Sequence, residues 1–378
     1  MKVFENARAF IGGKIVTANI VFDRRIRDMG RGKAAETVPL PKNALVLPGF
    51  IDEHVHGAGG ADTMDGSIEA LSTMANALAK EGTTAFLATT MTQSEENILR
   101  ALGAVKAYRE KNPAAGARLA GVHLEGPFIS AAHKGAQPEE YIAKPDIALF
   151  GEYQRASGDC IKIVTLAPEE EGAAELVKYL TAHGVLSSVG HTSAKFHDVE
   201  RAVLNGATHT THTFNAQSPL HHREIGTVGA ALLLDALTCE LIADCIHVSV
   251  PAMKLLFQCK GEKVILITDA IRAKGLKDGE SELGGQKVFV KNGEARLADG
   301  TLAGSVLKMN IALKNAVKEA GVPLERAVRC ATENPARALG IFHETGSIEV
   351  GKRADFSVLD EDFNVVMTVR DGETVYRA

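Results

Sequence analysis

The sequence predicts an α/β protein: a (β/α)8 TIM-type barrel with a small β-sandwich domain formed from both chain ends. Two observations predict the barrel: apolar runs alternate with helix-like segments from Leu45 onward, and eight of these runs fit strands. A third observation predicts the small domain, because both chain ends have the pattern of short β-strands. We therefore expect residues 1–44 and 346–378 to build the small domain and residues 45–345 to form the barrel.

The eight barrel strands are assigned to short apolar runs. They are residues 45–52, 84–90, 118–124, 161–166, 185–190, 207–212, 239–244 and 263–268. Helix-like segments connect them, and several end in glycine, the usual residue at a helix C terminus. They include residues 67–82, 94–112, 172–184 and 194–206. After the eighth strand, Asn292-Gly293 predicts a hairpin within residues 284–300, and two helices follow near 305–320 and 323–340.

The composition argues against several classes of protein. Hydrophobic residues make up 45% of the 378 residues, which is enough for a substantial core. A net charge of −5 without a basic run argues against a nucleic-acid partner and a membrane surface. The first residues carry charge where a secretory signal is apolar, and no run approaches the roughly 20 apolar residues of a membrane span. The five cysteines form no CxxC pair, so we expect a cytoplasmic protein with reduced cysteines.

Residues that can bind a metal follow several of the predicted strands. His54 and His56 are two residues apart, so on a strand they point the same way. Glu125 follows the apolar run LAGVHL, His191 ends LSSVGH, and His212 ends ATHTTH. Parallel barrel strands present their C-terminal ends on one face, so we expect these side chains to converge on a divalent metal. Imidazole and carboxylate ligands accept zinc, iron, manganese or cobalt, and no thiolate narrows the choice.

Two further residues are candidates for the chemistry itself. Asp269 closes the strand pattern KVILITD, and beside a metal it could bind that metal, take a proton from water and return it to a leaving group. His247 follows ELIADC and could polarise a carbonyl or hold a substrate. His123 shares the facing of Glu125 and belongs either beside the metal or in the core. His209 lies within its strand, so we assign it to the core.

An anion site is suggested after the strand that ends in His212. Asn215 and Ala216 follow that strand directly, and Arg223 lies in the loop SPLHHREIG. Backbone N–H groups and a guanidinium can together bind an anion. An ordinary loop with a solvated arginine is the alternative, and the residues alone leave both open. The segment 133–137, which follows the third predicted strand, is an equally open candidate for a binding site.

With these residues assembled, the chain resembles the amidohydrolase superfamily and, more closely, the N-acetylglucosamine-6-phosphate deacetylases. The resemblance runs from about Leu45 to the C terminus through the motifs HLEGPF, VGHTSA, HTFNA, IADCIHV and ITDA. Other branches of the superfamily carry a carboxylated lysine at the end of strand four, where this chain reads IVTLAPEE without a lysine in place. Glu125 offers a carboxylate from strand three instead, which favours the deacetylase branch over hydantoinase-like or dihydroorotase-like enzymes.

The resemblance implies a role for each central residue. Glu125, His191 and His212 match the principal metal ligands of the family. Asp269 matches its catalytic acid and base, and His247 matches the histidine that contacts the substrate near the scissile amide. Asp269 is expected to be a further ligand. The divalent metal is expected to be zinc or iron, with manganese or cobalt as alternatives.

The resemblance also implies a phosphate site and a partner. Asn215, Ala216 and Arg223 match the phosphate-binding loop, to which the arginine is contributed across a dimer interface, so a homodimer is expected. Both His54 and His56 are present, whereas some members replace them and hold one metal, so one or two ions are expected here.

Gln137 departs from the pattern of the family members that have a substrate-contacting histidine at this position. A glutamine can hydrogen-bond a sugar hydroxyl or carbonyl, but it cannot carry a proton, so we assign it substrate binding alone. The expected reaction is hydrolysis of the acetamide of N-acetyl-D-glucosamine 6-phosphate to D-glucosamine 6-phosphate and acetate, in amino-sugar catabolism. One alternative is an amidohydrolase that acts on a different N-acetyl sugar or amide. Another is a non-catalytic homologue that keeps the barrel as a scaffold.

Overall fold

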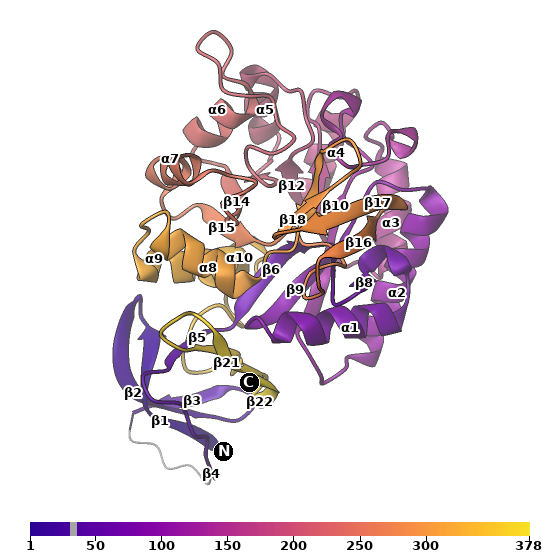
Figure 1. The fold of residues 1–378 in the computed structure, drawn as a ribbon. Helices are drawn as coiled ribbons and strands as arrows, with labels where there is room; N and C mark the ends of the chain where they lie inside the picture. Colours follow the sequence, from indigo (N-terminus) through magenta and orange to yellow (C-terminus); the bar gives the residue numbers. More distant parts are fainter. Residues whose placement is uncertain (31–35) are drawn as a thin grey trace.

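The computed structural model describes residues 1–30 and 36–378, which form a barrel and a smaller β-domain (Figure 1). Eight neighbouring strands form the barrel sheet, and each pairs in parallel with the next. In order they are β6 (Phe50–Val55), β9 (Thr83–Thr90), β10 (Arg118–Glu125), β11 (Ile161–Leu166), β12 (Leu186–Val189), β13 (His209–Thr210), β14 (Thr238–Ile242) and β15 (Val264–Ile267). The predicted fold class is confirmed.

The barrel closes where the chain just past its last strand meets its first strand. Asp269 donates its backbone N–H to the carbonyl of His54 (2.8 Å), and His56 donates to the carbonyl of Ala270 (2.9 Å). Val55 and Ala270 form a parallel bridge at the same place. The strand ends therefore form a closed ring, which holds the residues that follow them on one face of the barrel.

Helices cover the barrel between its strands. They are α1 (Ile68–Ala79), α2 (Glu95–Lys111), α3 (Ile147–Ser157), α4 (Ala173–Ala182), α5 (Phe196–Leu204), α6 (Gly226–Leu233), α7 (Val250–Lys260), α8 (Met309–Lys318), α9 (Leu324–Ala331) and α10 (Glu333–Ala338). The side chain of Ser67 caps α1, and Asn112 ends α2 in the left-handed conformation at φ 43°. Within the described parts of the chain, no helix combines the length and apolar composition that a membrane span requires.

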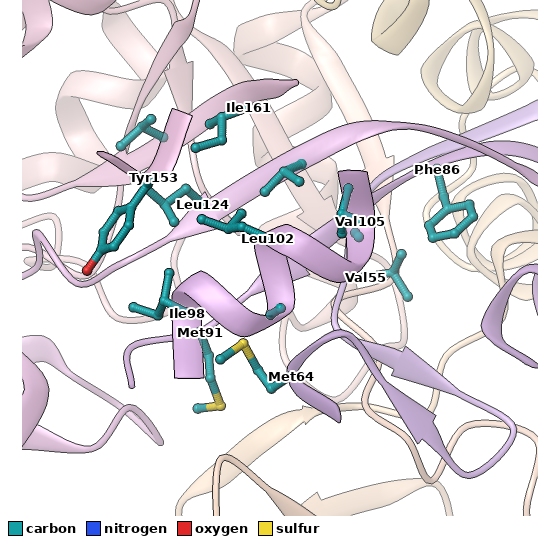
Figure 2. Packing of buried hydrophobic residues seen from close by; sticks show 14 of the residues in the cluster. Val55, Met64, Phe86, Met91, Ile98, Leu102, Val105, Leu124, Tyr153 and Ile161 are labelled. Atoms are coloured by element: carbon teal, nitrogen blue, oxygen red, sulfur yellow. The ribbon is translucent and has the colours of Figure 1, made fainter. Parts of the chain in front are cut away.

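The wall of the barrel is packed against these helices, as Figure 2 shows for α2. Ile98, Leu102 and Val105 recur at helical spacing along α2 and are fully buried. They belong to the same cluster as Phe86 on β9 and Leu124 on β10. Burying each such side chain stabilises the fold by about 1.5–3 kcal/mol, so the strands that carry the site are held in a rigid frame.

The small domain draws its strands from both chain ends, as predicted. In sheet order they are β22 (Glu373–Arg377), β21 (Val365–Arg370), β20 (Phe356–Leu359), β5 (Leu45–Pro48), β1 (Lys2–Ile11), β2 (Lys14–Phe22) and β3 (Ile26–Met29), with β4 (Glu36–Thr37) beside β1. The rings of Phe22 and Phe356 lie 5.2 Å apart although their strands are three positions apart. In a flat sheet such strands would lie about 14 Å apart, so this sheet folds over its own apolar face.

The predicted strand 45–52 is two strands rather than one. β5 pairs with β1 and β20 of the small domain, whereas β6 begins the barrel. Gly49 separates them, and a Cβ atom there would lie 2.1 Å from Oγ1 of Thr84, so a side chain does not fit. A continuous apolar run hides such a change of sheet. The domain bounds 1–44, 45–345 and 346–378 stay a prediction.

The insert after the barrel is larger than the predicted hairpin. It is a four-stranded antiparallel sheet of β16 (Gly279–Leu283), β17 (Gln286–Lys291), β18 (Glu294–Arg296) and β19 (Leu302–Ser305). The turn at Asn292-Gly293 has positive φ at both residues, as its sequence indicates. β16 was missed because it is largely exposed and polar. Gln286 donates its side-chain amide to the carbonyl of Ala136 (2.6 Å), which ties this sheet to the loop after β10.

Candidate metal centre and active site

Each predicted metal-binding side chain lies at the same end of the barrel. His54 is the second-last residue of β6, and Glu125 is the final residue of β10. His191, His212 and Asp269 each follow a strand by two residues and have positive φ values of 47°, 31° and 47°. Such backbone conformations are rare for residues with side chains and concentrate at functional sites.

Glu125 lies at the centre of the converging side chains. Its Oε1 is 3.1 Å from Nε2 of His212, 3.2 Å from Nε2 of His191 and 3.4 Å from Nε2 of His54. Its Oε2 is 3.1 Å from Nε2 of His56. The structure therefore brings together two sets of potential ligands that share one carboxylate: Glu125 with His191 and His212, and Glu125 with His54 and His56.

The hydrogen bonds behind the two histidines on one side of Glu125 determine which ring nitrogen faces it. Nδ1 of His191 lies 2.9 Å from the carbonyl oxygen of His133, and Nδ1 of His212 lies 3.1 Å from that of Asn215. A carbonyl can only accept, so each Nδ1 carries a proton, and in the neutral imidazole Nε2 then presents a lone pair. Yet the two Nε2 atoms lie 3.1 Å apart beside the Glu125 oxygen. Three acceptors that face one another are satisfied by a cation.

A divalent metal therefore fits the residues present. Nε2 of His54 is buried and makes no hydrogen bond within the described part of the chain, although it points at the carboxylates of Glu125 and Asp269. Imidazole nitrogens and carboxylate oxygens are ligands for zinc, iron, manganese and cobalt.

Asp269 faces His54 and His56, which lie at the end of β6. Its Oδ1 lies 3.3 Å from Nε2 of His56 and 3.5 Å from Nε2 of His54. Burial raises the pKa of Asp269, but the nearby His54 and His56 outweigh burial and bring the pKa to about 2. Conversely, burial lowers the pKa of His56, while contacts with Asp269 and Glu125 raise it to about 10. The site thus keeps its carboxylates ionised, which is the setting that a bound cation requires.

His247 lies in the loop after β14 and lines the same cavity. Its Nδ1 is 2.6 Å from Oδ2 of Asp244, whose Oδ1 accepts the backbone N–H groups of Ile246 and His247 at 2.8 Å each. Burial lowers the pKa of His247, but the Asp244 carboxylate outweighs burial and raises it. With Nδ1 bound to Asp244, the remaining nitrogen is free to act on a ligand.

Gln137 lines the cavity, but its amide is already used within the protein. Nε2 donates to Oε2 of Glu125 (2.8 Å), and Oε1 accepts the backbone N–H of Thr92 (2.7 Å). The amide therefore orients the Glu125 carboxylate. The role that we predicted for Gln137, binding of the substrate, stays a prediction.

The cavity at this end of the barrel has a volume of about 350 Å³. Asn215 and Ala216 line it, together with Leu283 and Leu302 from the insert. Among the described residues, Arg223 does not line it: the side chain is exposed, and Nη1 lies 2.8 Å from Nε2 of its neighbour His222. The structure therefore brings Asn215 and Ala216 to the cavity and leaves Arg223 outside the cavity of its own chain.

His123 and His209, the two histidines for which a place in the core was considered, are buried in the barrel. Nε2 of His123 lies 2.7 Å from the hydroxyl of Thr165, and its ring packs against His54 with centroids 4.5 Å apart. Burial lowers the pKa of His123 to about 3 and that of His209 to about 4, so both are neutral. The burial of His209 agrees with the expectation that it belongs to the core. The ring of His123 packs against His54, which is a candidate ligand.

Sequence reasoning missed two carboxylates that hold candidate site residues. Glu240 on β14 is fully buried, and its Oε2 accepts from Nδ1 of His54 (2.9 Å) and from the backbone N–H of His212 (3.0 Å). Asp244 holds His247, as described above. An acidic residue inside the apolar run TCELIAD was the available signal, because an unpaired charge within a barrel strand is costly unless it has a partner.

A (β/α)8 barrel whose strand ends gather four histidines and two carboxylates around one cavity defines a metal-dependent hydrolase of the amidohydrolase class. The model of the Amidohydrolase family matches residues 45–375. With the relatives described next, this match shows that the chain belongs to the amidohydrolase family and, within it, to the N-acetylglucosamine-6-phosphate deacetylases.

The relatives match this chain along most of their length. The N-acetylglucosamine-6-phosphate deacetylase of Bacillus subtilis is 46% identical over 345 residues, which cover 90% of this chain and 87% of the relative. An N-acetylgalactosamine-6-phosphate deacetylase of Escherichia coli O157:H7 is 37% identical over 349 residues, covering 91% and 92%. The solved deacetylase from Pasteurella multocida has a TM-score of 0.94 at 31% identity and full coverage of both chains. A variant from Mycobacterium smegmatis in complex with N-acetyl-D-glucosamine-6-phosphate has a TM-score of 0.92 at 32% identity, covering 99% of both chains.

Proposed function

We propose that this enzyme hydrolyses the acetamide of N-acetyl-D-glucosamine 6-phosphate to D-glucosamine 6-phosphate and acetate, in amino-sugar catabolism. The observation that carries the proposal is the convergence of four histidine Nε2 atoms on the Glu125 carboxylate at a cavity that Asp269 and His247 also line. The family to which the chain belongs supports the choice of substrate.

The proposed metal site takes one or two divalent ions, zinc or iron first and manganese or cobalt as alternatives. The proposed ligands are His54, His56, Glu125, His191, His212 and Asp269. A metal held there would polarise the amide carbonyl and bring the pKa of water towards about 7. The orientation of the histidine rings, with Nδ1 of His191 and His212 bonded to backbone carbonyls, prepares the site for such an ion.

Asp269 is the proposed acid and base. Its carboxylate is ionised, so it can take a proton from the attacking water. The same oxygen then gives the proton to the amine nitrogen as the C–N bond breaks. The amine is a poor leaving group without that proton, so the transfer is necessary for turnover.

His247 is the proposed donor to the carbonyl oxygen. With Nδ1–H bound to Asp244, a proton on Nε2 makes the ring an imidazolium, and Asp244 favours this charged form. The imidazolium donates to the carbonyl oxygen as negative charge develops there, which lowers the barrier when the donor is already in position.

Asn215, Ala216 and the guanidinium of Arg223 form the proposed phosphate site, with the arginine supplied by a second copy of the chain. Arg223 is exposed and lies outside its own cavity, as an arginine that serves a neighbour would. Leu204, Leu220 and Leu233 are 81%, 52% and 66% exposed, and they lie on α5, on the Arg223 loop and on α6. Large exposed leucines in packed neighbouring elements support a homodimer interface there.

A cytoplasmic location is part of the proposal. A phosphorylated sugar is charged and stays within the compartment where it is made, so its deacetylase must share that compartment. The five cysteines are free, which is the usual state in a reducing compartment.

A second candidate substrate is N-acetyl-D-galactosamine 6-phosphate, because one relative at 37% identity is a deacetylase of that name. Acetate release from both phosphorylated sugars and from unphosphorylated N-acetylglucosamine, with metal content counted, tests the proposal. Acetate release from N-acetyl-D-glucosamine 6-phosphate, and not from the other two compounds, supports the proposal. A preference for N-acetyl-D-galactosamine 6-phosphate favours the second candidate. Metal-loaded protein that releases acetate from none of the three would contradict both.

A further inference from the structure

Glu240 is one of several polar side chains buried in the barrel interior, with Glu53, His123 and His209. Interior positions of such barrels are usually filled by branched apolar side chains. Glu240 is fully buried, and its second oxygen, Oε1, has no hydrogen-bond partner among the described residues. Packing of the barrel does not explain a carboxylate at this position.

The other oxygen of Glu240 makes two contacts with candidate metal ligands. Oε2 accepts from Nδ1 of His54 at 2.9 Å and from the backbone N–H of His212 at 3.0 Å. Both of these histidines face the same oxygen of Glu125, Oε1, with their Nε2 atoms at 3.4 Å and 3.1 Å. A single oxygen of Glu240 therefore connects two residues that converge on a single oxygen of Glu125 from the first and sixth barrel strands.

The contact with His54 is chemically different from those of its neighbours. Nδ1 of His191 and Nδ1 of His212 lie against neutral backbone carbonyls, whereas Nδ1 of His54 lies against a carboxylate. A charge-assisted hydrogen bond is stronger and makes Nε2 of the ring a better electron-pair donor. The ring of His123 packs edge-on against His54, so the hydrogen bond and this packing together set the ring orientation.

We propose that Glu240 is the positioning residue of the metal centre: it fixes the tautomer and orientation of His54 and anchors the turn that carries His212. This inference rests on the metal site of the proposed function. The role assigned to Glu240 acts through its hydrogen bonds to these two histidines. A cation bound by these histidines would compensate for the negative charge of Glu240 in the core.

Three variants test the role. Glu240→Gln removes the charge but keeps an acceptor, and Glu240→Met removes both with little change in volume. The control is Glu53→Gln on β6, because Glu53 is also fully buried and its carboxylate has no hydrogen-bond partner in the described chain. Its Oε1 lies 3.9 Å from Nε2 of His209 and makes no hydrogen bond to a candidate ligand, so the control replaces a second buried carboxyl group without removing a contact of those ligands.

The first measurement is the affinity of the metal-free protein for Co²⁺ and Zn²⁺, with bound metal counted. Glu240→Met is expected to bind metal about ten- to a hundredfold more weakly, Glu240→Gln less so, and Glu53→Gln within about twofold of the unmodified protein. The second measurement is the ¹⁵N NMR tautomer state of His54, which should be Nδ1–H in the unmodified protein and mixed in Glu240→Met. If Glu240→Met fails to fold, Glu240→Gln carries both measurements.

The outcomes separate this inference from the function on which it rests. Unchanged metal affinity and an unchanged His54 tautomer in folded Glu240 variants would overturn the positioning role and leave the metal site standing. An equal loss of affinity in Glu53→Gln would also overturn it, because the effect would then belong to any buried carboxyl group in the barrel. Unmodified protein that binds no metal would overturn the proposed function itself.

Discussion

The carboxylate of Asp244 is the hydrogen-bond partner of His247, with Oδ2 2.6 Å from Nδ1 of the ring. The other oxygen of Asp244 is held by two backbone N–H groups of the same loop, so the pair is fixed as one unit. This arrangement settles which nitrogen of His247 is available to a ligand, and two of the predictions below depend on it.

Asp244→Asn is expected to lower kcat by about a hundredfold, because His247 loses the partner that holds it as a donor. KM should change much less, since the ring stays in place. Steady-state kinetics with counted metal check this. Asp362→Asn, an exposed change in the small domain, is the control and should behave like the unmodified enzyme. Equal kcat in the two variants would contradict the role of His247 as a donor.

The pH dependence of the reaction should follow the same pair. Asp244 raises the pKa of His247, and the protonated ring is the form that donates from both nitrogens. Activity should therefore persist below the raised pKa and fall as pH rises through it. In Asp244→Asn the carboxylate that raises the pKa of His247 is absent, so this pKa should fall. The alkaline limb of kcat/KM should therefore move to lower pH. An alkaline limb at the same pH in both proteins would assign it to another group.

Asp269→Asn is expected to reduce turnover by at least a thousandfold, because the amide cannot accept a proton from water or return one to the amine. The Glu125, His191 and His212 contacts remain, so metal content should stay near that of the unmodified enzyme. Acetate release and metal analysis on the same preparation check both points. An active variant would remove Asp269 from the mechanism.

Arg223→Ala is expected to raise KM for the phosphorylated sugar at least tenfold while changing kcat little, because the guanidinium binds phosphate remote from the amide. The measurement is steady-state kinetics at several salt concentrations. Arg201→Ala on α5 removes another exposed arginine and serves as the matched control. Mixing Arg223→Ala with Asp269→Asn gives a sharper result: shared sites would recover partial activity in mixed dimers, and no recovery would contradict the contribution across the interface.

The last prediction concerns acid stability and the junction of the two domains. Oδ2 of Asp371 lies 2.8 Å from Arg118 at the start of β10, and Oδ1 lies 2.9 Å from Arg353. Burial raises the pKa of Asp371, but Arg118 and Arg353 outweigh it and lower the pKa to about 2. The folded pKa lies below the unfolded value near 3.8, so the stabilisation is full above about pH 4 and disappears as pH falls towards 2.

Asp371→Asn should therefore lower stability by about 1 kcal/mol at neutral pH, after allowance for solvent screening at this partly exposed site. Asparagine tolerates the positive φ of 49° at this position, so the backbone should not change. The difference in Tm between variant and unmodified protein should shrink between pH 4 and pH 2. A constant difference over that range would assign the effect to something other than the ionised carboxylate.

The sequence predicted those parts of the fold that depend on periodicity. The barrel strands between residues 84 and 268 and the helices α1, α2, α4 and α5 follow from buried runs and capping residues, and they lie within a few residues of the predicted ranges. It did not separate β5 from β6, because the run LVLPGFI is apolar across their junction and only the close approach of Thr84 to Gly49 marks the boundary.

The candidate site was predictable where a residue follows a strand, and not where it acts from inside one. His54, Glu125 and His212 could be grouped because strand ends share a face of the barrel. Glu240 lies in the middle of β14, and its partners come from strands that are distant in sequence. Such a pairing requires the closed barrel to be known before it can be seen.

The closure of the barrel, where the chain just past β15 meets β6, has a consequence for the synthesis of the enzyme. His54 and Asp269 are joined there by a backbone hydrogen bond, although more than half of the chain separates them. A chain still emerging from the ribosome has His54 early, yet it lacks Asp269, the proposed proton acceptor, until the last barrel strand has been made. A chain that ends before residue 269 is therefore expected to be inactive, however many barrel strands it contains.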